Sequence, residues 1–348
     1  MVAARPLSMT AQTAWQDLVR LLRESAVAGL RGTPKRKSVR GRDYWFDQYR
    51  VGEKVIEKYI GEDDPALRDR MEWLRELRGA ARDRERQQAR LVRLLRAEGL
   101  LMPDLATGQL LTAMSRAGTF RLGGTLVGTQ AFRHFEGLLG IGFGLDASAQ
   151  TDDLDIASFE RLSVALSEAG EGVDPGMNDL LGDLEFEALP SLERGRVWRW
   201  RQTRQQTLVE FLTPSFEADE GLRDLPALGV SAQSLHFLNY LIAGPVQVPV
   251  LYRSGALIQV PRPERYAMHK LIVAERRRDG VEAAKARKDR AQAELLIAHF
   301  AETDPFLLAE TFEDAVARGR SWRTKIEASL ARMPAAAAAL DRARTEAG

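Results

Sequence analysis

Residues 151–157 have the sequence TDDLDIA, in which Asp153 and Asp155 alternate with Leu154 and Ile156. On a β-strand, residues two positions apart point to the same face, so the two carboxylates would stand side by side while the apolar side chains face a core. Two adjacent carboxylates repel each other, and a divalent cation such as Mg²⁺ is their usual counter-charge. The segment therefore predicts a strand that carries either a metal site or, as the ordinary alternative, a solvated Asp-rich end.

A phosphate-binding turn is predicted upstream of this strand, in residues 119–140, TFRLGGTLVGTQAFRHFEGLLG. The pattern indicates a buried strand that ends at Val127, a turn at Gly128 and Thr129, and an amphipathic helix. Glycine lets a ligand approach the backbone closely, and the helix N-terminus and the Thr129 hydroxyl offer donors that suit a triphosphate. Taken alone, the same pattern also fits an ordinary strand-to-helix turn.

A third acidic position lies downstream, in residues 207–214, TLVEFLTP, where Glu210 stands between Val209 and Phe211. A carboxylate inside an apolar strand is costly unless it is paired, protonated or bound to a cation. The glycine turn, the paired aspartates and this glutamate share one explanation, which is a two-metal site for nucleotidyl transfer.

The order of these three motifs, LVGTQAF, TDDLDIA and VEFLTP, resembles a bacterial nucleotidyltransferase family within the DNA polymerase β-type nucleotidyltransferase superfamily. The resemblance implies an α+β fold, with a polymerase β-like mixed sheet and flanking helices. It also implies that Asp153, Asp155 and Glu210 bind Mg²⁺ or Mn²⁺, and that Gly128 and Thr129 hold the triphosphate of an NTP substrate. In the family, the third acidic residue is more commonly Asp than Glu.

The resemblance continues through residues 258–277, IQVPRPERYAMHKLIVAERR. It implies that Lys270, in the HKL element, contacts nucleotide phosphates. The residues themselves predict a helix that begins at Pro263, on which Lys270 would be a surface or snorkelling lysine.

Other segments flank this catalytic region. Residues 10–29 predict a helix, residues 37–61 a twisted hairpin, residues 63–99 a long charged helix, and the C-terminal part further helices. Three domains are expected, at residues 1–102, 103–262 and 263–348. The hairpin is both basic and aromatic, which suits either a nucleic-acid surface or a solvated sheet edge.

The composition is that of an ordinary globular protein. Of its 348 residues, 45% are hydrophobic and 28% charged, and the net charge is +1. There is no cysteine, which excludes thiolate ligands and a cysteine nucleophile and suits a reducing compartment. The first residues do not look like a signal peptide and no apolar run is long enough to span a bilayer, so we expect a cytoplasmic protein with no membrane partner.

The expected activity is metal-dependent transfer of an NMP from an NTP to a hydroxyl acceptor. The sequence leaves the acceptor open between RNA, such as a tRNA end, a protein and a small molecule, and it leaves the oligomeric state open. Relatives in the superfamily include toxins of toxin–antitoxin pairs, which suggests that role by analogy only. The alternative is a non-catalytic module that binds nucleic acid or protein on the same fold.

Overall fold

The computed structural model describes residues 5–27, 33–39, 41–51, 54–143, 153–204, 207–279 and 282–347. Parts of the expected elements lie outside these ranges. They are residues 28 and 29 of the helix expected over 10–29, residues 40, 52 and 53 of the expected hairpin, and Thr151 and Asp152 of the TDDLDIA segment.

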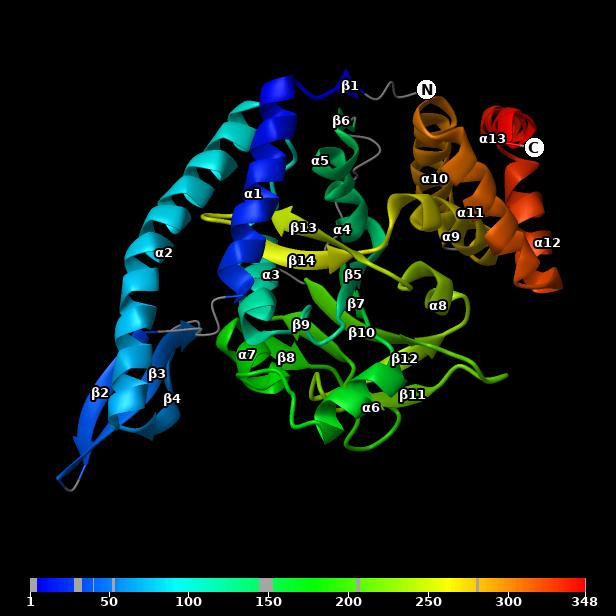
Figure 1. Ribbon diagram of the computed structural model, residues 1–348. Helices are drawn as coiled ribbons and strands as arrows, with labels where there is room; N and C mark the ends of the chain where they lie inside the picture. Colours follow the sequence, from blue (N-terminus) through cyan, green and yellow to red (C-terminus); the bar gives the residue numbers. More distant parts are fainter. Residues whose placement is uncertain are drawn as a thin grey trace.

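A mixed β-sheet forms the centre of the protein (Figure 1). Its strands follow the order β11-β12-β10-β7-β5, with β9 beside β10 and β8 beside β9. Strand β10 is parallel to β7 and β12, and the other pairs are antiparallel. The strands are β5 (Thr125–Val127), β7 (Asp153–Ala157), β8 (Phe186–Ala188), β9 (Arg199–Gln202), β10 (Leu208–Pro214), β11 (Leu222–Leu225) and β12 (Val230–Leu235). This mixed sheet with its flanking helices confirms the predicted α+β class.

Short helices and two small sheets surround the central sheet. The helices are α3 (Leu105–Ala117), α4 (Gly128–Arg133), α5 (Phe135–Leu139), α6 (Glu160–Glu168), α7 (Met177–Asp183) and α8 (Leu238–Leu241). The small sheets are antiparallel and pair β13 (Val246–Val250) with β14 (Ala256–Val260), and β1 (Arg5–Pro6) with β6 (Ile141–Gly142).

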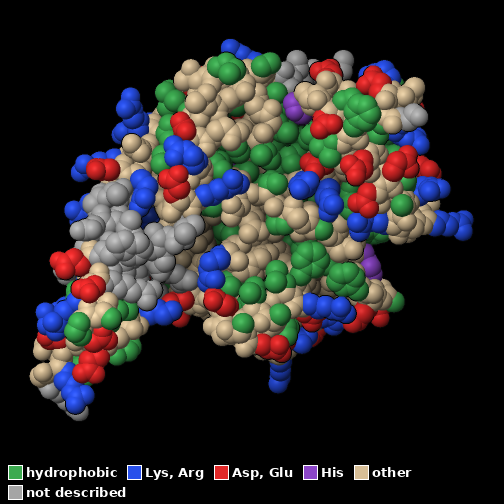
Figure 2. All heavy atoms as spheres, viewed as in Figure 1, with side chains coloured by type: hydrophobic (Ala, Val, Ile, Leu, Met, Phe, Trp, Pro, Cys, Tyr) green, Lys and Arg blue, Asp and Glu red, His purple; other side chains and the backbone are tan. Residues whose placement is uncertain are grey.

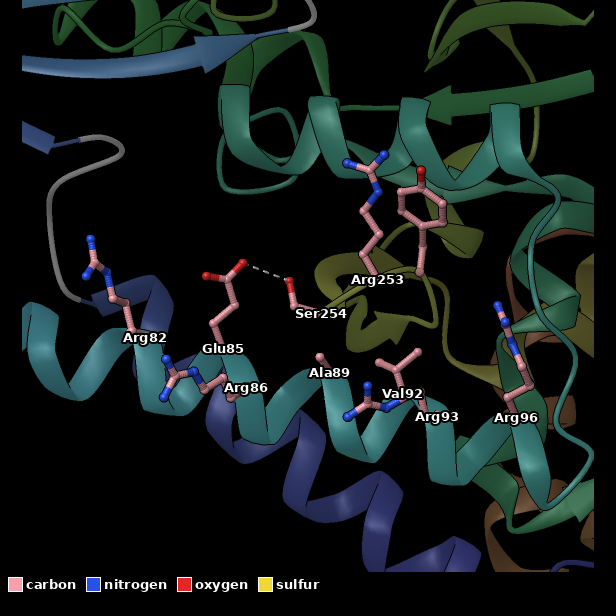
Figure 3. Close-up of a pocket in the computed structure, with 10 residues that line it drawn as sticks. Arg82, Glu85, Arg86, Ala89, Val92, Arg93, Arg96, Arg253 and Ser254 are labelled. Atoms are coloured by element: carbon pink, nitrogen blue, oxygen red, sulfur yellow. Dashed lines mark hydrogen bonds between the residues drawn. The ribbon is translucent and has the colours of Figure 1, made fainter.

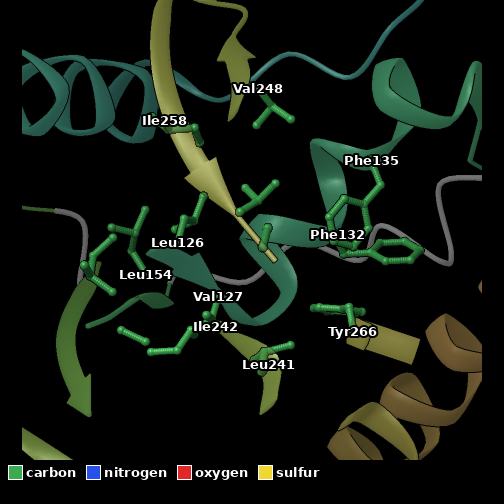
Figure 4. Packing of buried hydrophobic residues seen from close by; sticks show 14 of the residues in the cluster. Leu126, Val127, Phe132, Phe135, Leu154, Leu241, Ile242, Val248, Ile258 and Tyr266 are labelled. Carbon is green, nitrogen blue, oxygen red and sulfur yellow. The ribbon is translucent and has the colours of Figure 1, made fainter. Parts of the chain in front are cut away.

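A continuous hydrophobic core joins the sheet to these elements (Figure 4). Leu126 of β5, Leu154 of β7 and Ile258 of β14 are fully buried in it. The ring of Phe132 on α4 stacks on Tyr266 with centroids 6.0 Å apart, and Phe135 meets the same ring edge-on at 5.1 Å. The alternation predicted for β7 is confirmed, because Leu154 faces this core.

The N-terminal region packs on the core with its first helix and carries a small sheet that projects away from the core beside a long helix (Figure 1). It comprises α1 (Met9–Val27), the strands β2 (Thr33–Val39), β3 (Arg42–Val51) and β4 (Lys54–Glu62), and α2 (Pro65–Ala97). The expected hairpin is the antiparallel pair β3–β4, to which β2 adds a further strand. Helix α2 begins where expected, since the Asp64 side chain accepts a hydrogen bond from the Leu67 N–H and Pro65 follows as the first helical residue.

The basic side chains of this N-terminal sheet are balanced by acidic neighbours. Arg36 pairs with Asp63 at 2.8 Å and also with Asp43, and Lys37 pairs with Glu57. Figure 2 shows blue and red side chains next to each other on this projecting sheet. The pairing favours the solvated-edge interpretation of the hairpin over a nucleic-acid surface.

Five helices complete the chain and pack beside the central sheet (Figure 1). They are α9 (Pro263–Arg276), α10 (Ala283–Thr303), α11 (Pro305–Ala317), α12 (Arg320–Leu330) and α13 (Pro334–Ala347). The domain boundaries expected at residues 102 and 262 stay predictions. Across the described ranges, no helix combines the length and the apolar character that crossing a membrane requires.

The contact between α1 and α5 gives a first prediction. A Cβ on Gly137 would lie 2.1 Å from Trp15 Cδ1, so the indole packs directly on the α5 backbone. We expect Gly137→Ala to lower the free energy of unfolding by about 1–3 kcal/mol, because the extra methyl overpacks this contact. Urea denaturation measures the change.

Gly182→Ala is the matched control. It also places alanine in a short helix, but its Cβ would meet nothing within 4 Å. Helix propensity alone should make that variant neutral or more stable by up to about 1 kcal/mol. If both variants were equally stable, Trp15 would not be held against Gly137.

Candidate active site

The structure places the three predicted carboxylates on one face of the sheet. Strands β7 and β10 run in parallel register, with Asp155 beside Glu210 and Asp153 beside Leu208. Neighbouring strands lie about 4.8 Å apart, and Asp153 is two residues from Asp155 on the same face. The alternate side chains, such as Leu154 and Val209, are buried on the opposite face. The side chains that the sequence singled out thus meet, while their role as metal ligands stays a prediction.

The Asp155 carboxylate lies directly over the backbone of Gly128. A Cβ on Gly128 would be 2.6 Å from Asp155 Oδ2, and its φ is +68°. Helix α4 begins at Gly128 itself, so the turn is tighter than the expected two residues, and Thr129 is buried in the first helical turn. The Tyr266 hydroxyl lies 2.9 Å from both the Gly128 carbonyl and Gln292 Oε1, and these two oxygens share its single proton. Glycine is required here both by backbone conformation and by the carboxylate.

Burial and mutual repulsion raise the pKa of two of these carboxyl groups. Burial, together with the charge of Asp153, raises the pKa of Asp155 to about 6. Burial, together with the charge of Asp155, raises the pKa of Glu210 to about 7, although Arg199 on β9 opposes this shift. The site therefore concentrates negative charge that a cation would stabilise.

Cationic side chains from α9 and α10 face this negative charge. Lys270, Arg277 and Lys285 each act to lower the pKa of Asp155. Burial, followed by the charge of Lys270, lowers the pKa of Lys288. Anionic and cationic groups thus adjoin, as binding of a metal and a triphosphate requires.

Lys270 occupies a different environment from the one that its sequence suggests. It is buried rather than exposed, and its ammonium forms an ion pair with Asp289. Arg277 Nη1 contacts the other oxygen of the same carboxylate at 3.1 Å. Burial acts to raise the pKa of Asp289, but the charges of Lys270 and Arg277 lower it overall. Any phosphate bound by Lys270 would share that lysine with Asp289.

Sequence reasoning assigned no function to Tyr266, Asp289 or Gln292. A signal for Asp289 exists in the helical spacing of α10, because it falls in the buried stripe of that helix. The buried members of this stripe are Ala286, Asp289, Gln292, Ala293, Leu296, Ile297 and Phe300. A carboxylate in such a stripe indicates a buried charged partner.

The ion pair gives a second prediction. Asp289→Asn removes the counter-charge of Lys270 inside the protein, so we expect it to lower the free energy of unfolding by about 3–5 kcal/mol. Denaturant unfolding at neutral pH measures the loss.

The control is Asp17→Asn, which removes one partner of the exposed Arg20–Asp17 pair on α1. An exposed pair contributes at most about 1 kcal/mol. Equal effects of the two substitutions would contradict a buried, charge-compensated Lys270.

The donor chemistry of the site fits a hard divalent cation. Asp153, Asp155 and Glu210 offer only oxygen ligands, which Mg²⁺ and Mn²⁺ prefer. Within the described ranges, no three or more His, Cys, Asp or Glu side chains form a group that could hold a metal ion. Mg²⁺ commonly takes one or two carboxylates and completes its shell with waters and substrate phosphates, so these residues suit a metal that binds together with the nucleotide.

Comparison with known proteins identifies the class to which this fold and site belong. A family model described as Nucleotidyltransferase matches residues 105–317, more than half of the chain, and the protein belongs to this family. A second model, Domain of unknown function (DUF6788), matches residues 15–69.

A solved structure is also similar to the chain. It is the crystal structure of an antigenic nucleotidyltransferase-like protein from Paracoccidioides brasiliensis, with 12% sequence identity and a TM-score of 0.33. The similarity covers 65% of this chain and 94% of the other. The comparison with curated proteins finds no match.

Proposed function

We propose that the protein transfers a nucleoside monophosphate from an NTP to a hydroxyl acceptor in a reaction that depends on Mg²⁺ or Mn²⁺. The observation that carries the proposal is the placement of Asp155 beside Glu210 across β7 and β10, next to Asp153 and against Gly128. The cations of α9 and α10 adjoin these carboxylates and supply the opposite charge that a triphosphate needs. Membership of the nucleotidyltransferase family supports the reaction type.

In this proposal the acceptor oxygen forms a bond to the α-phosphorus, and the bond from that phosphorus to the bridging oxygen of pyrophosphate breaks. Asp153, Asp155 and Glu210 would hold the metal, which when bound neutralises phosphate charge and favours loss of the acceptor proton. Glu210 would also lie close enough to the acceptor to take up that proton. The Gly128 backbone, the Thr129 hydroxyl and Lys270 would position the triphosphate.

The proposed acceptor is a hydroxyl of RNA, such as a tRNA end, or of a protein, in the cytoplasm. A toxin role rests on the sequence resemblance alone and predicts that expression of the active protein arrests growth.

Incubation with Mg²⁺ or Mn²⁺, each α-labelled NTP, and total RNA or cell lysate tests the proposal. Label should enter RNA or protein with the wild type and not with Asp153→Ala/Asp155→Ala. If no label transfers and calorimetry detects no metal-dependent NTP binding, the fold would instead serve as a non-catalytic binding module.

A further inference from the structure

A basic groove lies between α2 and the turn that joins β13 to β14, away from the carboxylates. The cavity has a volume of about 640 Å³ and is lined by Arg82, Arg86, Arg93 and Arg96 from α2 and by Arg253 from the turn. Figure 3 shows the α2 arginines following one another along the helix, with a hydrogen bond from Ser254 to Glu85 joining the two walls. Among the described residues that line the groove, Glu85 alone is acidic. The groove is therefore strongly cationic in a protein whose net charge is +1.

Four of these five arginines differ from the ion-paired basic residues of the N-terminal sheet, because they form no ion pair within the described residues. Arg86 pairs with Asp83 at 3.3 Å. The other four are exposed and form no ion pair with any residue that the structure describes. Four guanidinium groups thus keep their hydrogen-bonding capacity and charge for a ligand.

The spacing of the arginines indicates a long ligand. The lining positions of α2 recur every three or four residues and so share one face of the helix; they are Arg82, Arg86, Ala89, Arg93 and Arg96. From Arg82 to Arg96 the helix rises about 21 Å, whereas one strand of nucleic acid carries a phosphate about every 3.4 Å along a duplex axis. The row is longer than the phosphate chain of a single nucleotide. Its length suits a polyanion with many phosphates.

Tyr252 forms part of the groove wall and is held in place by its neighbours. The Tyr252 hydroxyl is buried and accepts or donates no hydrogen bond within the described residues. The ring is fixed, because a Cβ on Gly108 would lie 2.6 Å from Tyr252 Cδ2 and Arg253 covers the ring at 5.2 Å. Because the hydroxyl itself is buried, a ligand in the groove does not reach it, and Tyr252 contributes only a rigid part of the wall.

We propose that this groove binds the phosphodiester backbone of a nucleic acid. Strand β14, whose five residues span about 17 Å, leads away from the Tyr252–Gly255 turn and packs on β5, the strand that ends next to Gly128. That this nucleic acid is the acceptor of nucleotidyl transfer rests on the proposed function, whereas binding by the groove does not. An acidic protein is the competing ligand; guanidinium groups bind its carboxylates too, but these do not recur with the regular spacing of backbone phosphates.

Fluorescence anisotropy with a labelled single-stranded RNA of about 20 nucleotides, at salt concentrations from about 50 to 200 mM, tests the proposal without NTP or metal. The groove variant is Arg93→Ala/Arg96→Ala/Arg253→Ala. The matched control is Arg90→Ala/Arg161→Ala/Arg320→Ala, which removes three exposed arginines that do not line the groove.

The groove variant should bind RNA at least about tenfold more weakly and lower the slope of log K against log salt by about two, while the control binds as the wild type does. Tyr252→Phe keeps the ring and removes only a buried hydroxyl, so it should bind RNA as the wild type does. Equal binding by the groove variant and the control would overturn the proposal, as would displacement of RNA by polyglutamate at the same charge concentration. Asp155→Asn should bind RNA normally, so failure of catalysis and failure of the groove give different results.

Discussion

Asp155→Asn is expected to reduce nucleotidyl transfer by at least about 10³-fold while making the metal-free protein more stable at pH 8. The carboxylate lies between Asp153, Glu210 and the Gly128 backbone, where an amide cannot supply the charge that a metal requires. Without metal, the charged form of Asp155 destabilises the folded protein. Burial and repulsion by Asp153 disfavour this form and raise the pKa of Asp155 to about 6. Activity and stability should therefore change in opposite directions.

The pH dependence follows from the direction of the shift. A carboxyl group whose pKa is higher in the folded state binds more protons there than in the unfolded state. Its folded form is favoured at low pH, and the free energy of unfolding falls as pH rises from the unfolded pKa of about 4 through the folded pKa. The pH range over which stability falls therefore ends at about 6 for Asp155 and at about 7 for Glu210.

Thermal unfolding of the metal-free protein, measured from a pH of about 4 to a pH of about 8, tests this dependence. The stability difference between Asp155→Asn and the wild type should increase with pH and then level off. Glu187→Gln is the control, since Glu187 lies on β8 of the same sheet but is exposed. A pH-independent difference, or a destabilised variant at pH 8, would show that Asp155 is not held in an anionic environment.

Gly128→Ala is expected to lower kcat/KM by at least about 100-fold, because displacing a catalytic group by about 1 Å has an effect of this size. The new methyl would lie only 2.6 Å from Asp155 Oδ2, so either the carboxylate or the start of α4 must move. A positive φ also costs an alanine about 1–2 kcal/mol of stability. Steady-state kinetics and thermal unfolding together separate the two effects.

Gly229→Ala controls for the backbone cost. Gly229 has a φ of +66°, close to that of Gly128, but its Cβ would meet no atom within 4 Å. This variant should lose a similar amount of stability and keep its activity. If Gly128→Ala were as active as Gly229→Ala, close contact with Asp155 would not be needed for transfer.

The strands of the candidate site could be predicted from the sequence because their signals are local. Alternation in residues 153–157 and 208–211 places the acidic and apolar side chains on opposite faces, and the structure confirms both strands. The pairing of these two strands joins segments that lie far apart in the sequence. The motif order pointed to it only through resemblance, and the structure supplies the register of Asp155 with Glu210.

Other features depend on contacts between distant segments and were not predicted. Lys270 looks like a surface residue in its own helix, and its burial follows from Asp289 on the next helix. The charged face of α2 looks like a solvated helix, and the groove exists only because the Tyr252–Gly255 turn packs opposite it. In each case the partner lies in another element, so periodicity alone could not reveal it.

Calorimetric titration of a non-hydrolysable NTP analogue, with and without Mg²⁺, tests the central claim most directly. Wild-type protein should bind the analogue at least about tenfold more tightly with Mg²⁺ than without it, and Asp155→Asn should lose that difference, because the carboxylates hold the metal against the phosphates. Equal affinity with and without Mg²⁺, or an undiminished Mg²⁺ effect in Asp155→Asn, would contradict a metal-dependent nucleotide site at β7 and β10.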